Sequence, residues 1–383
     1  MRRLTNIAAA LVAGGLASCG GLILGPDPVP PAAEVHARRF ATVLDSLRYA
    51  LDFPALAAAI VTDDSIVEAA AVGSRRYGGA LNVTDADQFH LGSCTKAITA
   101  TLIGVLVDEG RLSWTTTVAE LFPELAGSMR AEYRGVTVRE LLSHSGGVVR
   151  DPDLKLGGAT PREQRERAVM WALQQRPIGP RGSFSYSNMG YIVMGAAAER
   201  LTDTAFEDLM VEKVLRPLGI TSGGFGPMGT PGLEDQPLQH TTNHGVVEPT
   251  PDADVAPVYS PSGRLHMSIG DWARFARWRL AAEAGPGRQT LVRDQTARVL
   301  TEPAVAESGD SQYALGWVVV DRSWGGGRTL QHNGSNILNY STIALAPVQH
   351  WGMVVVTNQG PGKVENPTNA VVVRLIQLRQ SGR

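Results

Sequence analysis

Residues 93–107 read Ser-Cys-Thr-Lys-Ala-Ile-Thr-Ala-Thr-Leu-Ile-Gly-Val-Leu-Val, and Lys96 is the only charged side chain among them. The apolar run stops before Gly110, a residue type that commonly ends helices. The pattern therefore predicts a buried helix that begins near Ser93. Ser93 and Lys96 stand at positions i and i+3, so a helix places both on one face, close enough for a hydrogen bond between Oγ and the lysine nitrogen.

A serine next to a buried lysine is a candidate nucleophile with its own base. Burial lowers the pKa of a lysine because the charged form loses hydration, so a neutral Lys96 could accept the proton of Ser93. The helix N-terminus adds partial positive charge beside a developing oxyanion. Alone, Ser-x-x-Lys is only moderately specific, because an N-cap serine followed by a surface lysine gives the same pattern. Lysine is scarce in this chain, which favours the functional interpretation.

A second candidate segment is Tyr186-Ser187-Asn188, which lies between a loop containing proline and glycine and a predicted helix over residues 189–200. Loops in such places can project side chains into a cleft. Tyr186 could shuttle a proton, and the Asn188 amide offers a donor and an acceptor to a substrate amide or to Lys96. By itself this pattern is weak, since a half-buried tyrosine beside an asparagine that bonds its own turn is more common.

The third candidate segment, His332-Asn333-Gly334, ends a predicted strand. Gly334 would let a substrate backbone lie close along the strand edge. The N–H of Ser335 could then join the N–H of Ser93 in an oxyanion hole. A core or surface histidine without a catalytic role is the ordinary alternative for His332.

Strand patterns occur near both ends of the chain, and helix signals dominate its middle. The predicted strands are residues 55–62, 66–72, 315–321, 329–334, 340–346 and 352–357. Amphipathic helices are predicted over residues 35–49 and 368–378. The two ends of the chain should therefore supply the strands of one mainly antiparallel sheet that is flanked by helices.

Within the middle of the chain, Thr137 with Glu140 and Thr204 with Glu207 fit the capping-box pattern and predict helix starts. The sequence His-Ser-Gly at residues 144–146 falls in this region, and we interpret it as structural. We expect an α+β fold. An α/β sheet domain, residues 36–110 and 255–383, would carry an inserted all-helical domain, residues 111–254.

The N-terminus has the pattern of an export signal. Arg2 and Arg3 precede a short apolar run over residues 7–16, which is too short to span a bilayer. The run ends in Leu-Ala-Ser before Cys19, so we predict a lipoprotein signal peptide over residues 1–18 and a lipid on Cys19. Residues 19–35 would be a tether, and the mature protein would lie in a bacterial cell envelope, in the periplasm or on the outer surface. A plain secretory cleavage with an incidental Cys19 is the alternative.

Composition excludes several kinds of partner. The formal net charge is −2, without long runs of one sign, so no nucleic acid is expected, and membrane contact is expected only through the lipid. His240 and His244 are four residues apart, but no carboxylate completes a metal site with them, and we expect neither a metal nor a cofactor. Cys94, beside the candidate nucleophile, is interpreted as a packing residue.

Ser-x-x-Lys, Tyr-x-Asn and His-x-Gly, in this order, resemble the three motifs of the serine hydrolase family that contains the class C β-lactamases, the D-alanyl-D-alanine carboxypeptidases and related esterases. The likeness spans roughly residues 36–380. It implies a β-lactamase/transpeptidase-like fold with Ser93 as the acylated nucleophile and with Lys96 and Tyr186 as the proton carriers. It also implies substrate contacts from Asn188 and the strand motif.

The strand motif departs from the β-lactamases, which have a lysine where this chain has His332. A histidine there resembles the carboxypeptidase and esterase branches, and its charge near neutral pH is conditional. Asn333 also replaces the usual hydroxyl side chain. We therefore expect hydrolysis of a small ester or a D-alanyl-type peptide, with a peptidoglycan stem peptide as one such substrate. The alternatives are a peptidoglycan- or penicillin-binding protein without turnover, and a weak β-lactamase.

Overall fold

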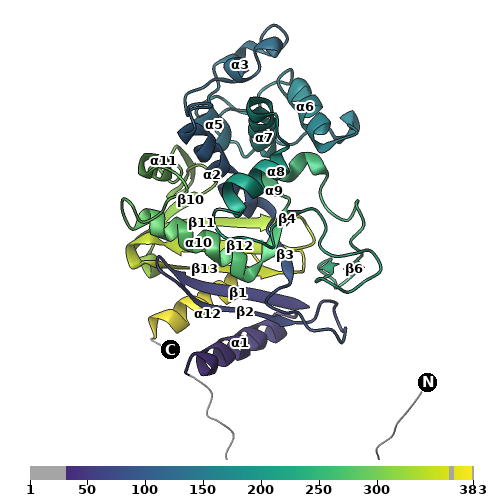
Figure 1. Ribbon diagram of the computed structural model, residues 1–383, viewed down its shortest axis with the longest axis vertical. Coiled ribbons are helices and arrows are strands. Elements are labelled where there is room, and N and C mark those ends of the chain that lie inside the picture. The colour runs from purple at the N-terminus through teal and green to yellow at the C-terminus, as the bar shows by residue number, and fades with distance from the viewer. Residues whose placement is uncertain (1–31, 362–365, 382–383) are drawn as a thin grey trace, which may run out of the picture.

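The computed structural model describes residues 32–361 and 366–381 (Figure 1). Eight strands form one antiparallel sheet in the order β2-β1-β13-β12-β11-β10-β9-β8. Their bounds are β1 Ala55–Thr62, β2 Ile66–Gly73, β8 Val305–Ser308, β9 Ser311–Tyr313, β10 Val318–Arg322, β11 Gly327–Ser335, β12 Tyr340–Ala346 and β13 Trp351–Thr357. Because β1 pairs with β13, the two ends of the chain share one sheet, as the sequence predicts.

Strand β1 lies inside this sheet and is buried on both faces. Leu56 and Ala58 pack on the side of α1 (Ala32–Ala50) and α12 (Asn369–Gln380). Ala57 and Ala59, which point the other way, belong to the core that includes α10 (Ile269–Glu283). Side chains alternate across a strand, so a run in which every residue is apolar is what a strand covered on both faces requires.

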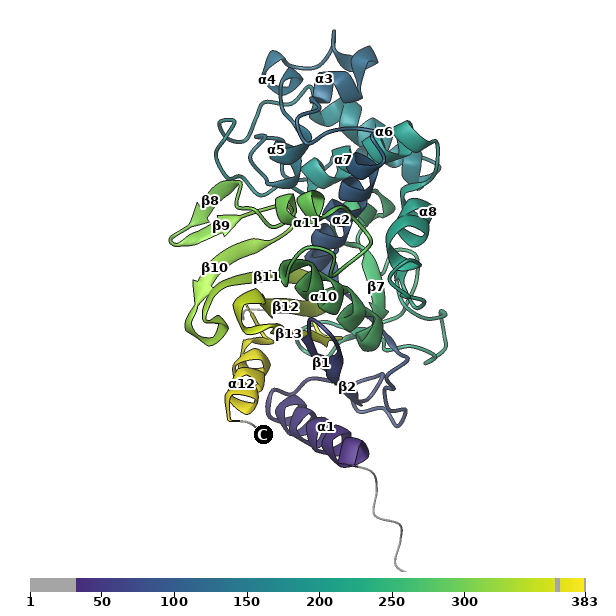
Figure 2. The ribbon, with the colours of Figure 1, turned by 60° about the vertical axis from the view of Figure 1, so that its left-hand side comes forward.

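Helices therefore cover both faces of the sheet. In Figures 1 and 2, α1 and α12 lie beneath it, while α10 lies on the opposite face. The buried helix α2 (Thr95–Asp108) connects this layer with the helices above it, since α2 contacts α7 and α9. The other α-helices are α3 Val118–Leu121, α4 Ala131–Arg134, α5 Val138–Leu142, α6 Pro161–Ala172, α7 Asn188–Thr202, α8 Phe206–Met210, α9 Ser260–Gly263 and α11 Asp294–Val299.

Several short strands lie outside the predicted ones. A second sheet has the order β3-β7-β4, and β5 pairs with β6. Their bounds are β3 Gln88–His90, β4 Gly224–Phe225, β5 Gln239–His240, β6 Val246–Val247 and β7 Leu265–Ser268. Since β4, β5 and β6 fall within residues 111–254, that stretch is not all-helical as predicted; its helices are joined by long loops and accompanied by three short strands.

One predicted capping box is wrong, although a helix, α8, does begin nearby at Phe206. Thr204 does not cap α8, whose N-cap is Ala205 and which has no side-chain cap. The Glu207 carboxylate instead accepts hydrogen bonds from the buried Arg165. The capping box of Thr137 with Glu140 is confirmed at the start of α5.

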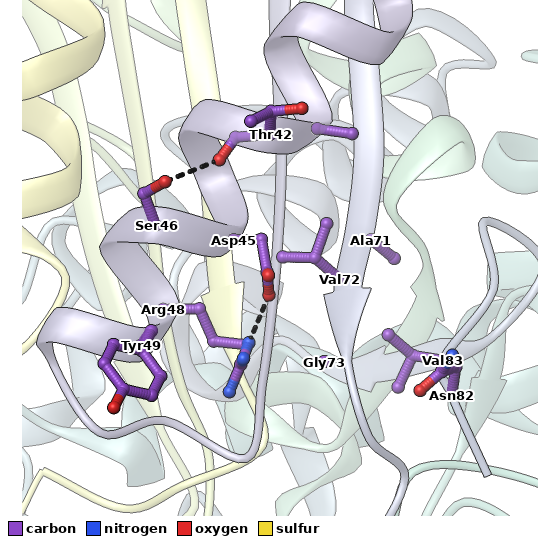
Figure 3. A pocket seen from close by; sticks show the side chains of 11 residues that line it. Thr42, Asp45, Ser46, Arg48, Tyr49, Ala71, Val72, Gly73, Asn82 and Val83 are labelled. Atoms are coloured by element: carbon purple, nitrogen blue, oxygen red, sulfur yellow. Dashed lines mark hydrogen bonds and ion pairs between the residues drawn. The ribbon is translucent and has the colours of Figure 1, made fainter.

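The predicted signal peptide and Cys19 lie outside the described residues, as does most of the predicted tether. Helix α1 begins at Ala32, inside the stretch expected to be tether. A hollow between α1 and the outer strand β2 is lined by side chains that include Thr42, Asp45 and Arg48 (Figure 3). It lies on the side of the sheet away from α2. Among the described residues, no helix has both the length and the apolar character needed to cross a bilayer.

Candidate active site

The site begins at the turn that leads into α2. Residues Gly92–Cys94 form a single 3₁₀ turn, and α2 follows from Thr95. Ser93 is partly exposed in this turn, while Lys96 one turn later is fully buried. The predicted helix is thus confirmed, with Ser93 in the turn that precedes it rather than in the α-helix itself.

Lys96 is held by three oxygen atoms. Its Nζ lies 3.1 Å from Ser93 Oγ, 2.7 Å from Asn188 Oδ1 and 2.7 Å from the backbone oxygen of Ser262. Asn188 is the first residue of α7, and Ser262 lies in α9, so three separate elements meet at this nitrogen. The amine is therefore fixed in position beside the serine.

Tyr186 approaches Ser93 from the other side. Its hydroxyl donates to Ser93 Oγ at 3.0 Å, and the ring lies 4.8 Å from Lys96 Nζ. The loop that carries Tyr186 ends at Ser187, whose hydroxyl caps α7 by accepting from the N–H of Gly190. Capping fixes the entry of the chain into the helix and with it the direction of the tyrosine. Ser93 Oγ thus lies between an amine and a phenol.

Burial changes the protonation of both partners of Ser93. It lowers the pKa of Lys96 to about 7, partly opposed by the negative charge of Asp151. It raises the pKa of Tyr186, partly opposed by the hydrogen bond to Ser93. The charged forms of both groups lose hydration, so burial favours a neutral amine and a neutral phenol. Near neutral pH, Lys96 can therefore accept a proton, whereas the Tyr186 hydroxyl stays protonated.

Asn188 connects Lys96 to a carboxylate. Its Oδ1 accepts from Lys96, and its Nδ2 donates to Asp151 Oδ1 at 2.8 Å. The hydroxyl of Tyr259 lies 3.3 Å from the same carboxylate oxygen. Asp151 was not singled out by the sequence, because no motif marks it. Its position fixes which end of the amide faces the lysine.

The strand motif packs directly against the turn that carries Ser93. A Cβ on Gly334 would lie 2.0 Å from the backbone oxygen of Leu91, and one on Gly92 would lie 2.2 Å from the backbone nitrogen of Ser335. Only glycine fits at either position. The Ser335 hydroxyl is used within its own turn, where it donates to Asn339 O and accepts from the N–H of Ile337. Ser335 therefore has only its backbone to offer to a ligand.

His332 faces the protein interior rather than Ser93. Its Nε2 lies 3.0 Å from the hydroxyl of Tyr313, and its Nδ1 lies 2.6 Å from the oxygen of Asn333. Burial and the nearby Lys96 lower the pKa of His332 to about 4, so the ring is neutral near pH 7. Within the described part of the chain, no hydrogen bond joins His332 to Ser93, Lys96 or Tyr186. It brings no positive charge to the neighbourhood of Ser93 near pH 7.

Comparison with known proteins identifies the family. The family model named Beta-lactamase matches residues 40–378, which is most of the chain. The chain belongs to the beta-lactamase family.

Two curated relatives and one solved structure are similar to this chain. Penicillin-binding protein 4 of Amycolatopsis lactamdurans is 29% identical over 327 residues, covering 82% of this chain and 84% of that protein. A putative D-alanyl-D-alanine carboxypeptidase of Escherichia coli (strain K12) is 24% identical over 355 residues, covering 82% and 80%. The structure of D-alanine carboxypeptidase AmpC from Burkholderia cenocepacia superposes with a TM-score of 0.69 at 19% identity, covering 90% and 99%. That last likeness concerns the fold alone.

This beta-lactamase family member also has a buried histidine behind its tyrosine. His144, interpreted from sequence as structural, has its ring 4.3 Å from that of Tyr186, and its Nδ1 accepts from the N–H of Ser187. It adopts a positive φ of 60°, which is uncommon for a residue with a side chain. The segment at residues 144–146 thus supports the loop that presents Tyr186, and it does so without touching Ser93.

The remaining candidates have ordinary packing roles. Cys94 is buried, and burial raises the pKa of its thiol to about 12, which keeps it unreactive. Both ring nitrogens of His240 are used inside the protein, since Nε2 accepts from the N–H of Tyr77 and Nδ1 lies 3.0 Å from the oxygen of Asn358. Across residues 32–361 and 366–381, no group of histidine, cysteine, aspartate or glutamate side chains has the arrangement of a metal site.

Proposed function

We propose that this protein is a serine hydrolase that acts through an acyl-Ser93 intermediate. The observation that carries the proposal is the placement of Ser93 Oγ between Lys96 Nζ at 3.1 Å and the Tyr186 hydroxyl at 3.0 Å. A nucleophile, a base and a second proton carrier in mutual contact are the arrangement that acyl transfer needs.

The contacts of Lys96 favour it as the base. A neutral amine has two N–H donors and one lone pair, and the two 2.7 Å contacts with Asn188 Oδ1 and Ser262 O account for both donors. The lone pair is then left for the hydroxyl proton of Ser93. Tyr186 stays protonated, and its hydroxyl donates a hydrogen bond to Ser93 Oγ. In the free enzyme it is therefore a proton carrier rather than a base.

The reaction follows in two balanced steps. Ser93 Oγ attacks the substrate carbonyl carbon, its proton passes to Lys96, and the N–H groups of Ser93 and Ser335 stabilise the oxyanion. The bond to the leaving group breaks as that group receives a proton, relayed from Lys96 through Tyr186. Water then attacks acyl-Ser93, Lys96 takes the proton of the water, and the proton returns to Ser93 as the acid leaves.

The substrate we propose is a small ester or a peptide of the D-alanyl type. The neutral His332 offers no standing attraction for a carboxylate, whether of a β-lactam or of a D-alanyl peptide, which favours the ester. The relative from Escherichia coli named as a putative D-alanyl-D-alanine carboxypeptidase supports the peptide option. The relative named penicillin-binding protein 4 favours a second candidate function, in which Ser93 is acylated but the acyl group is not released by water.

Covalent labelling tests the nucleophile. We expect an activated-serine probe to label the wild type and to leave Ser93→Ala unlabelled, because the attacking oxygen is gone. Ser113→Ala is the control, since Ser113 is exposed in the loop after α2. Undiminished labelling of Ser93→Ala would overturn the assignment. With p-nitrophenyl esters, a burst followed by steady turnover supports the hydrolase, whereas release that stops at one equivalent supports the binding protein.

We also propose that Cys19 carries a lipid that holds the protein in the bacterial cell envelope, as the sequence Leu-Ala-Ser-Cys at residues 16–19 indicates. In cells that express the full chain, the wild type should sediment with membranes, and Cys19→Ser should not. Cys94→Ala is the matched control and should stay with the membranes. If Cys19→Ser sediments like the wild type, the anchor is not at this cysteine.

A further inference from the structure

Three buried side chains from distant parts of the chain meet behind the candidate oxyanion hole. His90 ends β3, Asp254 lies in the segment between β6 and α9, and Asn336 directly follows β11. The side chains of His90 and Asp254 are both 0% exposed, and Asn336 is 2% exposed. We call this group the His90–Asp254–Asn336 bridge.

One end of the bridge holds the turn of the nucleophile. The N–H of Gly92, the residue before Ser93, donates to His90 Nδ1 at 3.0 Å. Because Nδ1 accepts, the proton of the ring is on Nε2, which donates to Asp254 Oδ2 at 3.0 Å. His90 thus transmits the position of the Asp254 carboxylate to the backbone of Gly92.

The other end holds the turn that follows Ser335. Asn336 Nδ2 donates to Asp254 Oδ1 at 2.9 Å, on the carboxylate oxygen that His90 does not use. Asn336 Oδ1 accepts from the N–H groups of Leu338 at 3.2 Å and Asn339 at 2.9 Å, which closes the turn. The same carboxylate therefore connects the residue before Ser93 with the residue after Ser335.

The charge of Asp254 suits this double role. Burial alone would raise the pKa of Asp254, but its contact with His90 and the hydrogen bonds from Asn336 and the N–H of Val255 lower it overall. A carboxylate accepts on both oxygens, whereas an asparagine has one accepting end and one donating end. The donors on both sides of residue 254 therefore require an aspartate.

Gly92 and Gly334 lie where the two backbone segments that the bridge connects approach each other. The closeness of Gly92 to Ser335 and of Gly334 to Leu91 leaves the segments in direct backbone contact. The Ser341 hydroxyl, which donates to Leu91 O at 2.6 Å, adds a second tie between the strands and the turn. The bridge therefore acts together with these contacts on the separation and direction of the two segments.

We infer that the His90–Asp254–Asn336 bridge sets the separation and direction of the two backbone N–H groups, of Ser93 and Ser335, that stabilise the oxyanion. This inference rests on the proposed function. The three residues are positioning residues, since none of them contacts Ser93 Oγ or a substrate. Oxyanion donors work only when they are aimed at the place where the charge develops, so small displacements lower the rate strongly.

The test compares Asp254→Asn with the wild type. The substitution preserves shape but places an N–H group against the donor of either His90 or Asn336, which breaks one arm of the bridge. With a p-nitrophenyl ester we expect kcat to fall at least about tenfold, while KM changes less than about twofold. The affinity for a phenylboronic acid, which forms a tetrahedral adduct on serine, should fall by a factor similar to that of kcat/KM.

Glu283→Gln is the matched control. Glu283 is a largely buried carboxylate with several partners, among them Arg279, Thr301 and Arg328, and it lies near the opposite end of β11 from Ser335. This variant should lose thermal stability without a change in kcat or boronate affinity. His90→Gln gives a second break in the bridge should Asp254→Asn fold poorly, and the same changes are expected of it.

The outcomes separate the bridge from the proposed function. If the bridge variants lose thermal stability but keep the kcat and the boronate affinity of the wild type, the bridge is merely structural and the inference is overturned. If the wild type itself neither hydrolyses esters nor binds the boronate, the proposed function fails, and the bridge fails with it. If the wild type binds the boronate but does not hydrolyse esters, the boronate affinity still depends on the geometry of the oxyanion hole. Comparing that affinity between the wild type and the bridge variants then still tests the inference.

Discussion

Lys96 has two charged neighbours that act on its pKa in opposite directions. Asp151, which reaches Lys96 through the Asn188 amide, raises the pKa of Lys96, and Arg150 lowers it. Arg150 and Asp151 are adjacent in sequence, and their side chains are 70% and 41% exposed to solvent. The protonation of a buried lysine is thus adjusted by two residues that can be replaced without touching Ser93.

A pH profile of acylation tests this arrangement. Because the base must be neutral, kcat/KM for an uncharged ester should rise about tenfold per pH unit below pH 7 and level off above it. Asp151→Asn removes a charge that raises the pKa of Lys96, so the rising limb should move to lower pH. Arg150→Gln removes a charge that lowers the pKa of Lys96, so the rising limb should move to higher pH. Limbs that do not move, or that move in the same direction, would contradict Lys96 as the base.

At the scale of elements, uniform apolar character and tight turns made prediction possible. The hairpin of β1 and β2 and the strand β12 were predicted within one residue of their observed bounds, because most side chains in them are apolar. The hairpin of β8 and β9 was missed. Its strands are short and carry exposed polar residues such as Ser308 and Gln312, so they show no apolar pattern.

The candidate site likewise contains residues that a sequence pattern marks and residues that only the fold brings together. Ser93, Lys96, Tyr186 and Asn188 were found because each belongs to a short pattern with a chemical reason. The backbone oxygen of Ser262 could not be found, since every residue type has one and only the fold brings it to Lys96. The same holds for the carboxylate of Asp254, which lies 164 residues from His90 in sequence. Tertiary contacts of this kind leave no local trace.

At the scale of the whole molecule, Asn358 connects three distant segments at the end of β13. Its Oδ1 accepts from the N–H of Ala55 at 2.9 Å, across 303 residues of sequence, and its Nδ2 donates to Leu238 O at 3.0 Å. Its backbone oxygen accepts from the N–H of His240 at 3.0 Å. The first strand, the last strand and the loop between β4 and β6 thus depend on one buried amide, which is 0% exposed.

Asn358→Leu should therefore destabilise the protein strongly although the two side chains are similar in size. The change leaves the N–H of Ala55 and the carbonyl of Leu238 buried without a partner, at a cost of about 1–3 kcal/mol for each group. We expect the free energy of unfolding in urea to fall by about 2–5 kcal/mol. Asn243→Leu, at an exposed position of the same loop, should change it by less than about 0.5 kcal/mol. Equal effects of the two substitutions would show that the amide of Asn358 does not hold these segments together.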